Sequence, residues 1–419
     1  MALVTLTEGT VILSETKDLR CFATLSMKGG TQEACMRFEF ATATRILFGP
    51  GTLREVPPAA KELGRRVLFV NGVPPEQSAP LVTQLEAAGV ACSSYAVVTE
   101  PTLDLIEQGV QLARQEQCDV VVGFGGGSAI DAAKAIAALL TNRGELMDYL
   151  EVIGKGGALR VASAPCIAVP TTAGTGAEVT RNAVLASPEH RVKVSLRSPW
   201  MLPRLAVVDP ELTFDLPPAI TAHTGLDALT QLIEPYVCLR ANPMTDGFSV
   251  EGMRRVSRSL RQAYHHGHDA AARTDMSLAS LFGGLALANA GLGAVHGFAA
   301  PLGGMFPAPH GAACAALLPH GMDVNIRALR ARAPESAALR RYEDVARLLT
   351  GRPSAAAEDG VEWVAQICQE LGIPPLRSYG IQDQDVPLLV EKAARASSMK
   401  ANPIALTPEE LREVLTRAL

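Results

Sequence analysis

The chain has 419 residues and a formal net charge of −5; 48% of its residues are hydrophobic and 19% are charged. At roughly 100 to 200 residues per domain, this length predicts two domains, each able to bury a core without disulfide bonds. The composition excludes a disordered, a collagen-like and a small secreted protein. The 38 basic and 43 acidic residues are scattered, so we expect no nucleic-acid partner and no membrane-binding surface.

The cysteines and the N-terminal stretch both bear on location. Eight cysteines are dispersed along the chain without a CxxC pair, which is typical of a reducing compartment. Acidic residues interrupt the N-terminal stretch early, at Glu8, Glu15 and Asp18, so we expect no signal peptide. The predicted location is the cytoplasm.

In chain order, residues 1–35 are expected to form an N-terminal extension of uncertain order. After them, short apolar or β-branched runs alternate with helical patterns. Strands are expected at 66–71, 92–98, 119–124 and 166–169. Helices are expected at 78–88, 103–116 and 128–140. This alternation predicts βαβ units and a mostly parallel sheet.

The character of the sequence changes after Asp209-Pro210. From about Pro217 onward the segments are helix-forming and rich in alanine and leucine, so the C-terminal half is expected to be all-helical. The boundary is expected near residues 212–218. We therefore predict a nucleotide-binding α/β domain over residues 36–215 and an all-α domain over residues 216–419.

One uncharged segment, Leu281 to Phe306, is long enough to cross a bilayer. It contains seven glycines, together with Asn289, His296 and Pro301. A lipid-exposed helix cannot continue through such a sequence without leaving backbone groups unpaired. We expect a buried helix-and-loop segment here.

Two glycine-rich turns follow predicted strands. Gly123-Phe-Gly-Gly-Gly-Ser128 opens a helix, and free backbone N–H groups at a helix start favour a pyrophosphate. Thr171-Thr172-Ala-Gly-Thr175-Gly176 follows the next strand, and ligands of doubly wound sheets bind at this edge. Taken alone, the first turn is equally well explained as a purely structural turn. The second turn is equally well explained if Thr175 caps the next helix. The two turns together favour a cofactor site.

A candidate metal site lies in the predicted helical half. Asp227 and Gln231 are four residues apart and project from one helix face, and a Pro/Gly loop separates His296 from His310. A carboxylate and two imidazoles suit Zn(II) or Fe(II). The alternative is two core histidines with satisfied hydrogen bonds. The remaining histidines receive no ligand role, and those at 265, 266 and 268 are expected in a solvated loop.

These motifs resemble those of the iron-containing (group III) alcohol dehydrogenase family, whose fold is shared with dehydroquinate synthase. The resemblance runs from about Met36 to near the C-terminus. It rests on blocks in the family's order and spacing: GFGGGSAIDAAKAIA, PTTAGTGAEVT, DPELT, TGLDALTQLIEPY and VHGFAAPLGGMFPAPHGAACAALLPH.

The resemblance implies an N-terminal NAD(P)-binding domain, a helical C-terminal domain and a divalent metal between them. The matching metal positions are Asp227, His296 and His310. The positions that match the pyrophosphate turn are Gly126, Gly127, Ser128 and Asp131. Those that match further cofactor and active-site contacts are Thr171, Thr172, Thr175, Thr180, Asn182 and Lys193.

Three positions depart from the family pattern. Gln231 stands where the usual second histidine ligand is expected, so either its amide coordinates loosely or the site has three protein ligands, and Zn(II) is expected to compete well with Fe(II). Ala300 replaces a histidine beside the nicotinamide that many members carry, so no side chain is assigned as the proton relay. Gly72 replaces an acidic residue of NAD-preferring members, so NADP(H) is expected to be accepted.

The predicted reaction is reversible hydride transfer between a small alcohol and the nicotinamide, with the metal polarising the substrate oxygen. Within the same family, the alternatives are a maleylacetate reductase and a hydroxyacid-oxoacid transhydrogenase. Both need cationic residues for a substrate carboxylate, and residues 277–322 contain no Arg or Lys. Further alternatives are a dehydroquinate synthase-type lyase and a metal-free binding descendant. A homodimer is implied by the resemblance.

Overall fold

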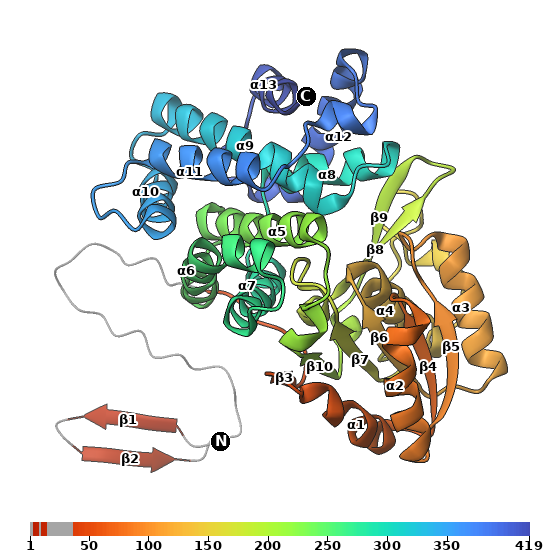
Figure 1. Cartoon of the computed structure of the whole chain (residues 1–419). Coiled ribbons are helices and arrows are strands. Elements are labelled where there is room, and N and C mark those ends of the chain that lie inside the picture. Colours follow the sequence, from red (N-terminus) through yellow and green to blue (C-terminus); the bar gives the residue numbers. More distant parts are fainter. Residues whose placement is uncertain (1–2, 8–9, 15–36) are drawn as a thin grey trace. The chain divides into compact units, whose positions relative to one another are not determined.

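A computed structural model describes residues 3–7, 10–14 and 37–419 of the chain (Figure 1). The chain divides into two units, residues 1–38 and 39–419. In the first unit, β1 (Leu3–Thr7) pairs antiparallel with β2 (Thr10–Ser14). Apart from these strands, the predicted extension over residues 1–35 lies outside the described residues.

A six-stranded parallel sheet lies in the first half of the second unit, in the order β3-β10-β7-β6-β4-β5. Its strands are β3 (Ile46–Phe48), β4 (Arg66–Asn71), β5 (Ala91–Ala96), β6 (Val120–Gly125), β7 (Cys166–Pro170) and β10 (Leu205–Val208). The central strands β6 and β7 are buried at every position. Continuous apolar runs are what a sheet covered on both faces requires.

Helices cover the two faces of this sheet. Val67 and Phe69 of β4 pack with α1 (Val56–Leu63) and α2 (Pro75–Ala87), whereas Leu68 and Val70 pack with α3 (Leu103–Gln115) and α4 (Gly127–Thr141). Alternate residues of one strand thus face opposite helix layers. The predicted α/β fold with a parallel sheet is confirmed, and the predicted strands and helices over residues 66–170 lie within a few residues of the observed ones.

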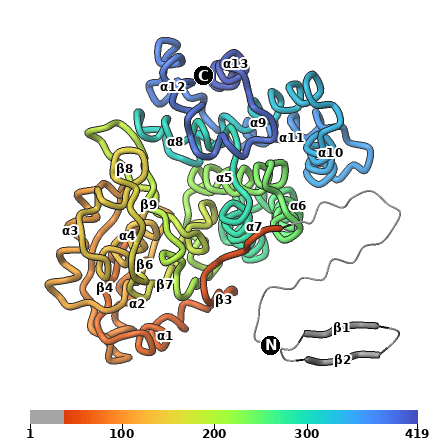
Figure 2. The backbone as a smooth tube through the Cα atoms, turned by 180° about the vertical axis from the view of Figure 1, so that it is seen from behind, coloured from red at the N-terminus to blue at the C-terminus, as the bar shows by residue number. Residues whose placement is uncertain are grey.

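Four strands and one α-helix in this half were missed. They are β3, α1, β10 and the antiparallel hairpin of β8 (Asn182–Ser187) and β9 (Val192–Arg197). The edge strand β3 has only three residues, too short to show a hydrophobic period. The hairpin forms a sheet of its own, and in both views it lies beside α8 (Ala294–Met305) (Figures 1 and 2).

Residues 218–419, all of which the structure describes, contain no strand, so the expected helical half is confirmed. Besides α8, its helices are α5 (Pro218–Val237), α6 (Pro243–His265), α7 (Ala270–Asn289), α9 (His310–Arg332), α10 (Ala337–Thr350), α11 (Ala357–Glu370), α12 (Val386–Arg395) and α13 (Pro408–Ala418). They share one large apolar core, in which α5 and α9 are buried along most of their length.

The apolar segment 281–306 consists of the end of α7, a short break and α8. Within the described part of the chain, no single helix is long and apolar enough to cross a membrane; α7 and α8 meet that criterion only as a pair, bent by 98°. Met276, Leu285, Phe298 and Leu302 of these helices are buried in the protein core. The expectation of a buried helix-and-loop segment is confirmed.

Candidate metal and cofactor site

Side chains from three helices of the C-terminal half meet at one point. Asp227 lies on α5, His296 on α8, and His310 and Cys314 on α9. Each offers one possible ligand atom, and these four atoms lie within 4.8 Å of one another. The structure thus brings together three of the predicted metal residues and adds a cysteine that the motif analysis missed. The signal was the four-residue spacing of His310 and Cys314, which places both on one helix face.

The individual distances describe a small closed cluster. Oδ1 of Asp227 lies 3.6 Å from Nε2 of His296 and 3.7 Å from Nε2 of His310. Sγ of Cys314 lies 3.9 Å and 3.7 Å from the same two nitrogens. The side chains of Asp227 and His296 are buried, whereas that of His310 is 33% exposed. The cluster is therefore buried in the helical core and open to solvent beside His310.

Glu234 orients one of the two imidazoles. It lies on α5, two turns after Asp227, and its Oε2 is 2.7 Å from Nδ1 of His296. Its other oxygen, Oε1, accepts a 2.7 Å hydrogen bond from the backbone N–H of Val295. A carboxylate on Nδ1 leaves Nε2 facing the cluster, as in carboxylate–histidine–metal arrangements. Sequence reasoning did not single out Glu234.

Gln231 lies beside the cluster and contacts Asp227. Its amide Nε2 donates a 3.0 Å hydrogen bond to Oδ2 of Asp227. In this arrangement the amide orients the carboxylate, and the remaining oxygen, Oδ1 of Asp227, faces the two imidazoles.

Two buried oxygens in this region have no hydrogen-bond partner, Oδ1 of Asp227 and Oε1 of Gln231. An unpaired buried polar atom costs about 1–3 kcal/mol, and more when it is charged. Carboxylate oxygen, imidazole nitrogen and thiolate sulfur are the usual ligands of divalent transition metals. The residues present therefore fit a divalent cation at this point.

Opposite charges face each other in the cluster. Burial lowers the pKa of His296, but the neighbouring Cys314, Asp227 and Glu234 raise it well above its ordinary value. Burial raises the pKa values of Asp227 and Cys314, but the two imidazoles bring both below their ordinary values. Each of these shifts favours the charged form of its group, and a divalent cation bound among them would stabilise the deprotonated carboxylate and thiol in the same way.

The glycine turn lies at the carboxyl edge of the parallel sheet. β6 ends at Gly125, and α4 begins at Gly127 with no side chain capping its N-terminus. The first N–H groups of α4 are therefore available to an anionic ligand. Ser128 is in the first turn of the helix. The structure thus places the predicted pyrophosphate turn at a bare helix N-terminus.

The threonine turn packs directly against the glycine turn. The backbone N–H of Thr171 donates to the carbonyl of Gly125 at 2.9 Å. A Cβ atom built on Gly127 would lie only 2.8 Å from the side chain of Thr175, and one on Gly126 would lie 3.5 Å from that of Thr172. The N–H of Ala177 donates to Oγ1 of Thr175 at 3.4 Å, but the N-cap of the short 3-10 helix η3 (Ala177–Val179) is Gly176, so Thr175 is not the cap of the next helix. The two turns form one continuous surface.

This surface reaches the helix that carries Asp227. A Cβ atom on Gly174 would lie 2.7 Å from Cβ of Thr224, which is three residues before Asp227 on α5. A Cβ atom on Gly176, where φ is +60°, would lie 2.4 Å from Cα of Gly284 on α7. Glycine is required at both positions because the threonine turn is packed tightly on the helical half. The candidate cofactor and metal sites are therefore neighbours.

Two further predicted cofactor residues belong to a buried ionic network around Lys134. Nζ of Lys134 lies 2.9 Å from Oδ1 of Asp131 and donates to Oγ1 of Thr180 at 2.9 Å and to the carbonyl of Ala177 at 2.8 Å. The other Asp131 oxygen accepts from the N–H of Val184. These contacts tie α4 to the threonine turn and to β8. In this structure Asp131 and Thr180 therefore bind Lys134 and connect the elements that carry the candidate site.

The remaining predicted cofactor residues lie on the hairpin and after β4. Asn182 begins β8, and Lys193 on β9 forms a 2.9 Å ion pair with Glu100. A Cβ atom on Gly303 of α8 would lie 2.8 Å from Nζ of Lys193, so this amine lies next to the helix of His296. Gly72 follows β4, where a Cβ atom would lie 2.6 Å from Cβ of Ala129. That close approach leaves no room for a side chain at Gly72.

The other histidines lie away from the cluster. His266 and His268 are exposed after the end of α6, as expected for a solvated loop, whereas His265 is exposed but is the last residue of α6. His223 lies on α5 near its N-terminus, and burial lowers its pKa. Ala300 lies on α8, four residues after His296, and is half-buried.

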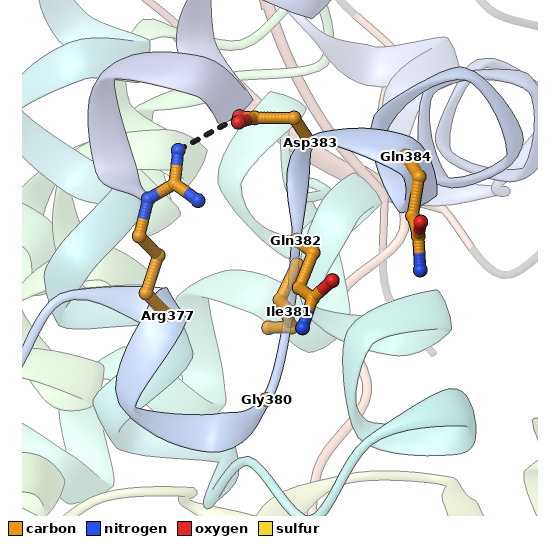
Figure 3. A pocket seen from close by; sticks show the side chains of 6 residues that line it. All are labelled: Arg377, Gly380, Ile381, Gln382, Asp383 and Gln384. Carbon is orange, nitrogen blue, oxygen red and sulfur yellow. Dashed lines mark hydrogen bonds and ion pairs between the residues drawn. The ribbon is translucent and has the colours of Figure 1, made fainter.

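A surface pocket between η6 (Leu376–Tyr379) and η7 (Asp383–Asp385) lies elsewhere on the chain (Figure 3). The ion pair of Arg377 and Asp383, 2.7 Å long, crosses it, and Gln382 and Gln384 also line it. None of the predicted site residues lies in this segment, so it is distinct from the candidate site.

Comparison with known proteins agrees with the geometry. The family model described as iron-containing alcohol dehydrogenase matches residues 43–210, and the model of the C-terminal part of the same family matches residues 221–419. The chain belongs to the iron-containing alcohol dehydrogenase family. It is thus an oxidoreductase that acts on CH–OH groups, as an alcohol dehydrogenase or aldehyde reductase linked to a nicotinamide cofactor.

Individual members of the family align over almost the whole chain. The chain is 36% identical to long-chain-alcohol dehydrogenase 1 of Geobacillus thermodenitrificans, over 90% of this chain and 97% of that protein. A solved 1,3-propanediol oxidoreductase is 33% identical with a TM-score of 0.85, over 92% of this chain and 100% of that one. Sulfoacetaldehyde reductase from Bifidobacterium kashiwanohense, solved with NAD⁺, is 27% identical with a TM-score of 0.79, over 91% and 98% of the two chains.

Proposed function

We propose that this enzyme is a metal-dependent NAD(P)-linked dehydrogenase of small neutral alcohols, working reversibly as an aldehyde reductase. In this proposal residues 36–215 hold the dinucleotide and residues 216–419 hold the metal. The observation that carries it is the buried cluster of Asp227, His296 and His310, directly beside the threonine turn through Gly174 and Thr224. A hydride donor on that turn reaches a substrate at the cluster.

Each part of the chain has its own task in the proposed reaction. Asp227, His296 and His310 hold the divalent ion, which when bound supplies a Lewis acid for the substrate oxygen. The N-terminus of α4 binds the pyrophosphate, and the glycines at 126 and 127 let the backbone approach it. Cofactor contacts from Thr172, Thr175, Asn182 and Lys193 remain part of the proposal. Such positioning brings the reacting carbons together at near-attack distance.

The proposed substrate is uncharged. Residues 277–322 supply α8 and the start of α9 and contain no Arg or Lys to bind a substrate carboxylate. This disfavours a maleylacetate reductase or a hydroxyacid-oxoacid transhydrogenase. The named relatives act on substrates as different as long-chain alcohols and sulfoacetaldehyde, so the family name alone does not select the alcohol.

The proposed cofactor range includes both NAD(H) and NADP(H). Gly72 has no carboxylate that could repel a 2′-phosphate. The close contact with Ala129 also leaves no space for an acidic side chain at position 72. For the metal, we propose that Zn(II) competes well with Fe(II), because no imidazole occupies position 231. A homodimer in the cytoplasm remains the prediction from family resemblance and from the dispersed cysteines.

The test is a panel of alcohols and aldehydes, assayed with both cofactors on protein reconstituted separately with Fe(II) and Zn(II). We expect one equivalent of NAD(P)H for each aldehyde formed. Replacing Asp227 with Asn should abolish turnover, whereas the exposed Asp104→Asn control on α3 should retain it. A product formed without net NAD(P)H would indicate a lyase of the dehydroquinate synthase type and overturn the proposal. A catalytic efficiency with NADP(H) at least a hundredfold lower than with NAD(H) would overturn the proposal that both cofactors are accepted.

A further inference from the structure

The metal-ligating cluster holds one more donor than the family resemblance assigns to it. We infer that the Sγ atom of Cys314 is a protein ligand of the metal, so that the ligand set is Asp227, His296, His310 and Cys314. The inference rests on the proposed metal site. In it, Cys314 takes the place of Gln231 as the fourth ligand.

The first argument is distance. In a tetrahedral site with metal bonds of about 2.0 Å to nitrogen or oxygen and about 2.3 Å to sulfur, neighbouring ligand atoms lie about 3.3–3.6 Å apart. The carboxylate oxygen of Asp227 lies 3.6 Å and 3.7 Å from the two imidazole nitrogens. Sγ of Cys314 lies 3.9 Å and 3.7 Å from the same nitrogens. These four distances exceed the tetrahedral values by only a few tenths of an ångström, and all four atoms lie within 4.8 Å of one another.

The second argument is the direction of the lone pairs. Glu234 on Nδ1 of His296 leaves Nε2 facing the cluster. Oδ2 of Asp227 is occupied by the amide of Gln231, while Oδ1 is buried and has no partner. The thiol of Cys314 is fully buried and contacts both imidazoles. Oδ1 of Asp227, the two Nε2 atoms and Sγ of Cys314 therefore lie together, and Oε1 of Gln231 is the other buried atom here without a hydrogen-bond partner.

The third argument concerns Gln231. As an amide it is a weak neutral ligand, and its Nε2 already donates to Asp227. Its side chain also packs on α7, where a Cβ atom on Gly283 would lie 3.2 Å from Cβ of Gln231. We therefore assign Gln231 the role of orienting Asp227; its Oε1 is buried without a partner, but this neutral amide oxygen is a weaker donor than the thiolate of Cys314.

The ligand set has consequences for the metal. One carboxylate and one thiolate neutralise a divalent cation in a buried site, where uncompensated charge is expensive. Thiolate is a soft ligand, and it favours zinc over ferrous iron beyond the usual order of affinities. Cobalt(II) takes the same tetrahedral sites as zinc and reports its ligands by absorption. It is therefore the natural probe.

The test uses the full-length protein, stripped with a chelator and loaded with one equivalent of Co(II) under a thiol-free reductant. We expect a thiolate-to-cobalt charge-transfer band in the near ultraviolet. The band should be absent in Cys314→Ser and Cys314→Ala and retained in Cys368→Ser. Cys368 on α11 is the matched control, because its thiol is buried beside α9 and donates to the carbonyl of Ala315.

Affinity provides a second readout. Zinc affinity should fall at least about 100-fold in Cys314→Ser, since the loss of a direct ligand exceeds the effect of an outer partner. X-ray absorption of the zinc-loaded wild-type protein needs no variant and should show one sulfur at about 2.3 Å. A zinc site with only nitrogen and oxygen neighbours would overturn the inference even if the Cys314 variants fail to fold.

The two proposals fail in different ways. If the cobalt band or the zinc–sulfur distance is seen but no alcohol yields net NAD(P)H, the proposed function falls and Cys314 ligation stands. Turnover by a wild-type enzyme whose bound metal has no sulfur neighbour would preserve the function and overturn the ligation. A wild-type protein that binds neither Co(II) nor Zn(II) also overturns the ligation.

Discussion

Glu234 accepts a hydrogen bond from Nδ1 of His296 over 2.7 Å, and both residues are buried. The same carboxylate accepts the N–H of Val295 at the start of α8. One side chain of α5 thus holds both the backbone of α8 and the ring that α8 presents to the metal site. The orientation of His296 therefore depends on Glu234, which lies in the block TGLDALTQLIEPY but received no role in the sequence analysis.

Replacing Glu234 with Gln should weaken metal binding. The His296 ring and the Val295 N–H bind different oxygens of Glu234, and in glutamine one of these oxygens becomes an NH2 group, so one of the two donors loses its acceptor. We expect zinc affinity to fall about 10–100-fold, measured by competition with a chromophoric chelator. The control is Glu391→Gln, an exposed glutamate of α12 that forms an ion pair with Arg395. Equal zinc affinity in the two variants would refute the role of Glu234.

Lys134→Met should destabilise the protein. It removes the partner of Asp131 and two further hydrogen bonds, from a lysine whose side chain is fully buried. Breaking a buried ion pair from one side costs about 3–5 kcal/mol. The free energy of unfolding is measured with urea, against the exposed Lys61→Met on α1, which should change it by less than about 0.5 kcal/mol. If the free energy of unfolding falls no more in Lys134→Met than in Lys61→Met, the stabilising role of the Lys134 network is refuted.

Gly127→Ala should weaken dinucleotide binding. The added Cβ lies 2.8 Å from the side chain of Thr175, so the two turns must separate at the proposed pyrophosphate site. We expect the dissociation constant of NAD(P)H to rise at least about tenfold, that is by about 1.4 kcal/mol, in a fluorescence titration. Gly247→Ala on α6 has open space around its Cβ and should bind the cofactor as the wild type does. Unchanged affinity in Gly127→Ala would exclude this turn as the pyrophosphate site.

Glu178 should make stability depend on pH. Burial raises the pKa of Glu178 from 4.5 to about 7, so the folded state keeps this proton to higher pH than the unfolded chain. The free energy of unfolding must then fall as pH rises from 4.5 towards 7. Glu178→Gln removes this contribution, and its advantage over the wild type should grow from near zero at pH 4.5 to about 3 kcal/mol at pH 7.5.

The measurement for Glu178 is denaturant unfolding of both proteins at several pH values, because the difference between them isolates one group. Glu62→Gln, exposed on α1, serves as the control and should follow the wild type at every pH. A constant difference between Glu178→Gln and the wild type across this range would show that the carboxyl ionises normally.

Local patterns were sufficient for much of the fold. The runs at 67–70 and 120–125 are continuously apolar because parallel strands are covered on both faces. The same patterns did not predict the hairpin of β8 and β9, whose strands are only partly buried and alternate in exposure. They also did not predict β3, because three residues are too few for a period.

For the site, the sequence by itself determined the residue types: two glycine-rich turns after strands, and Asp227, His296 and His310 in a helical half. Only the tertiary structure decided which side chains join them. Glu234 and Cys314 reach the cluster because α5, α8 and α9 cross at that point. The physical reason is that ligation and hydrogen bonding depend on distances of 3–4 Å between side chains, and packing of the helices sets those distances.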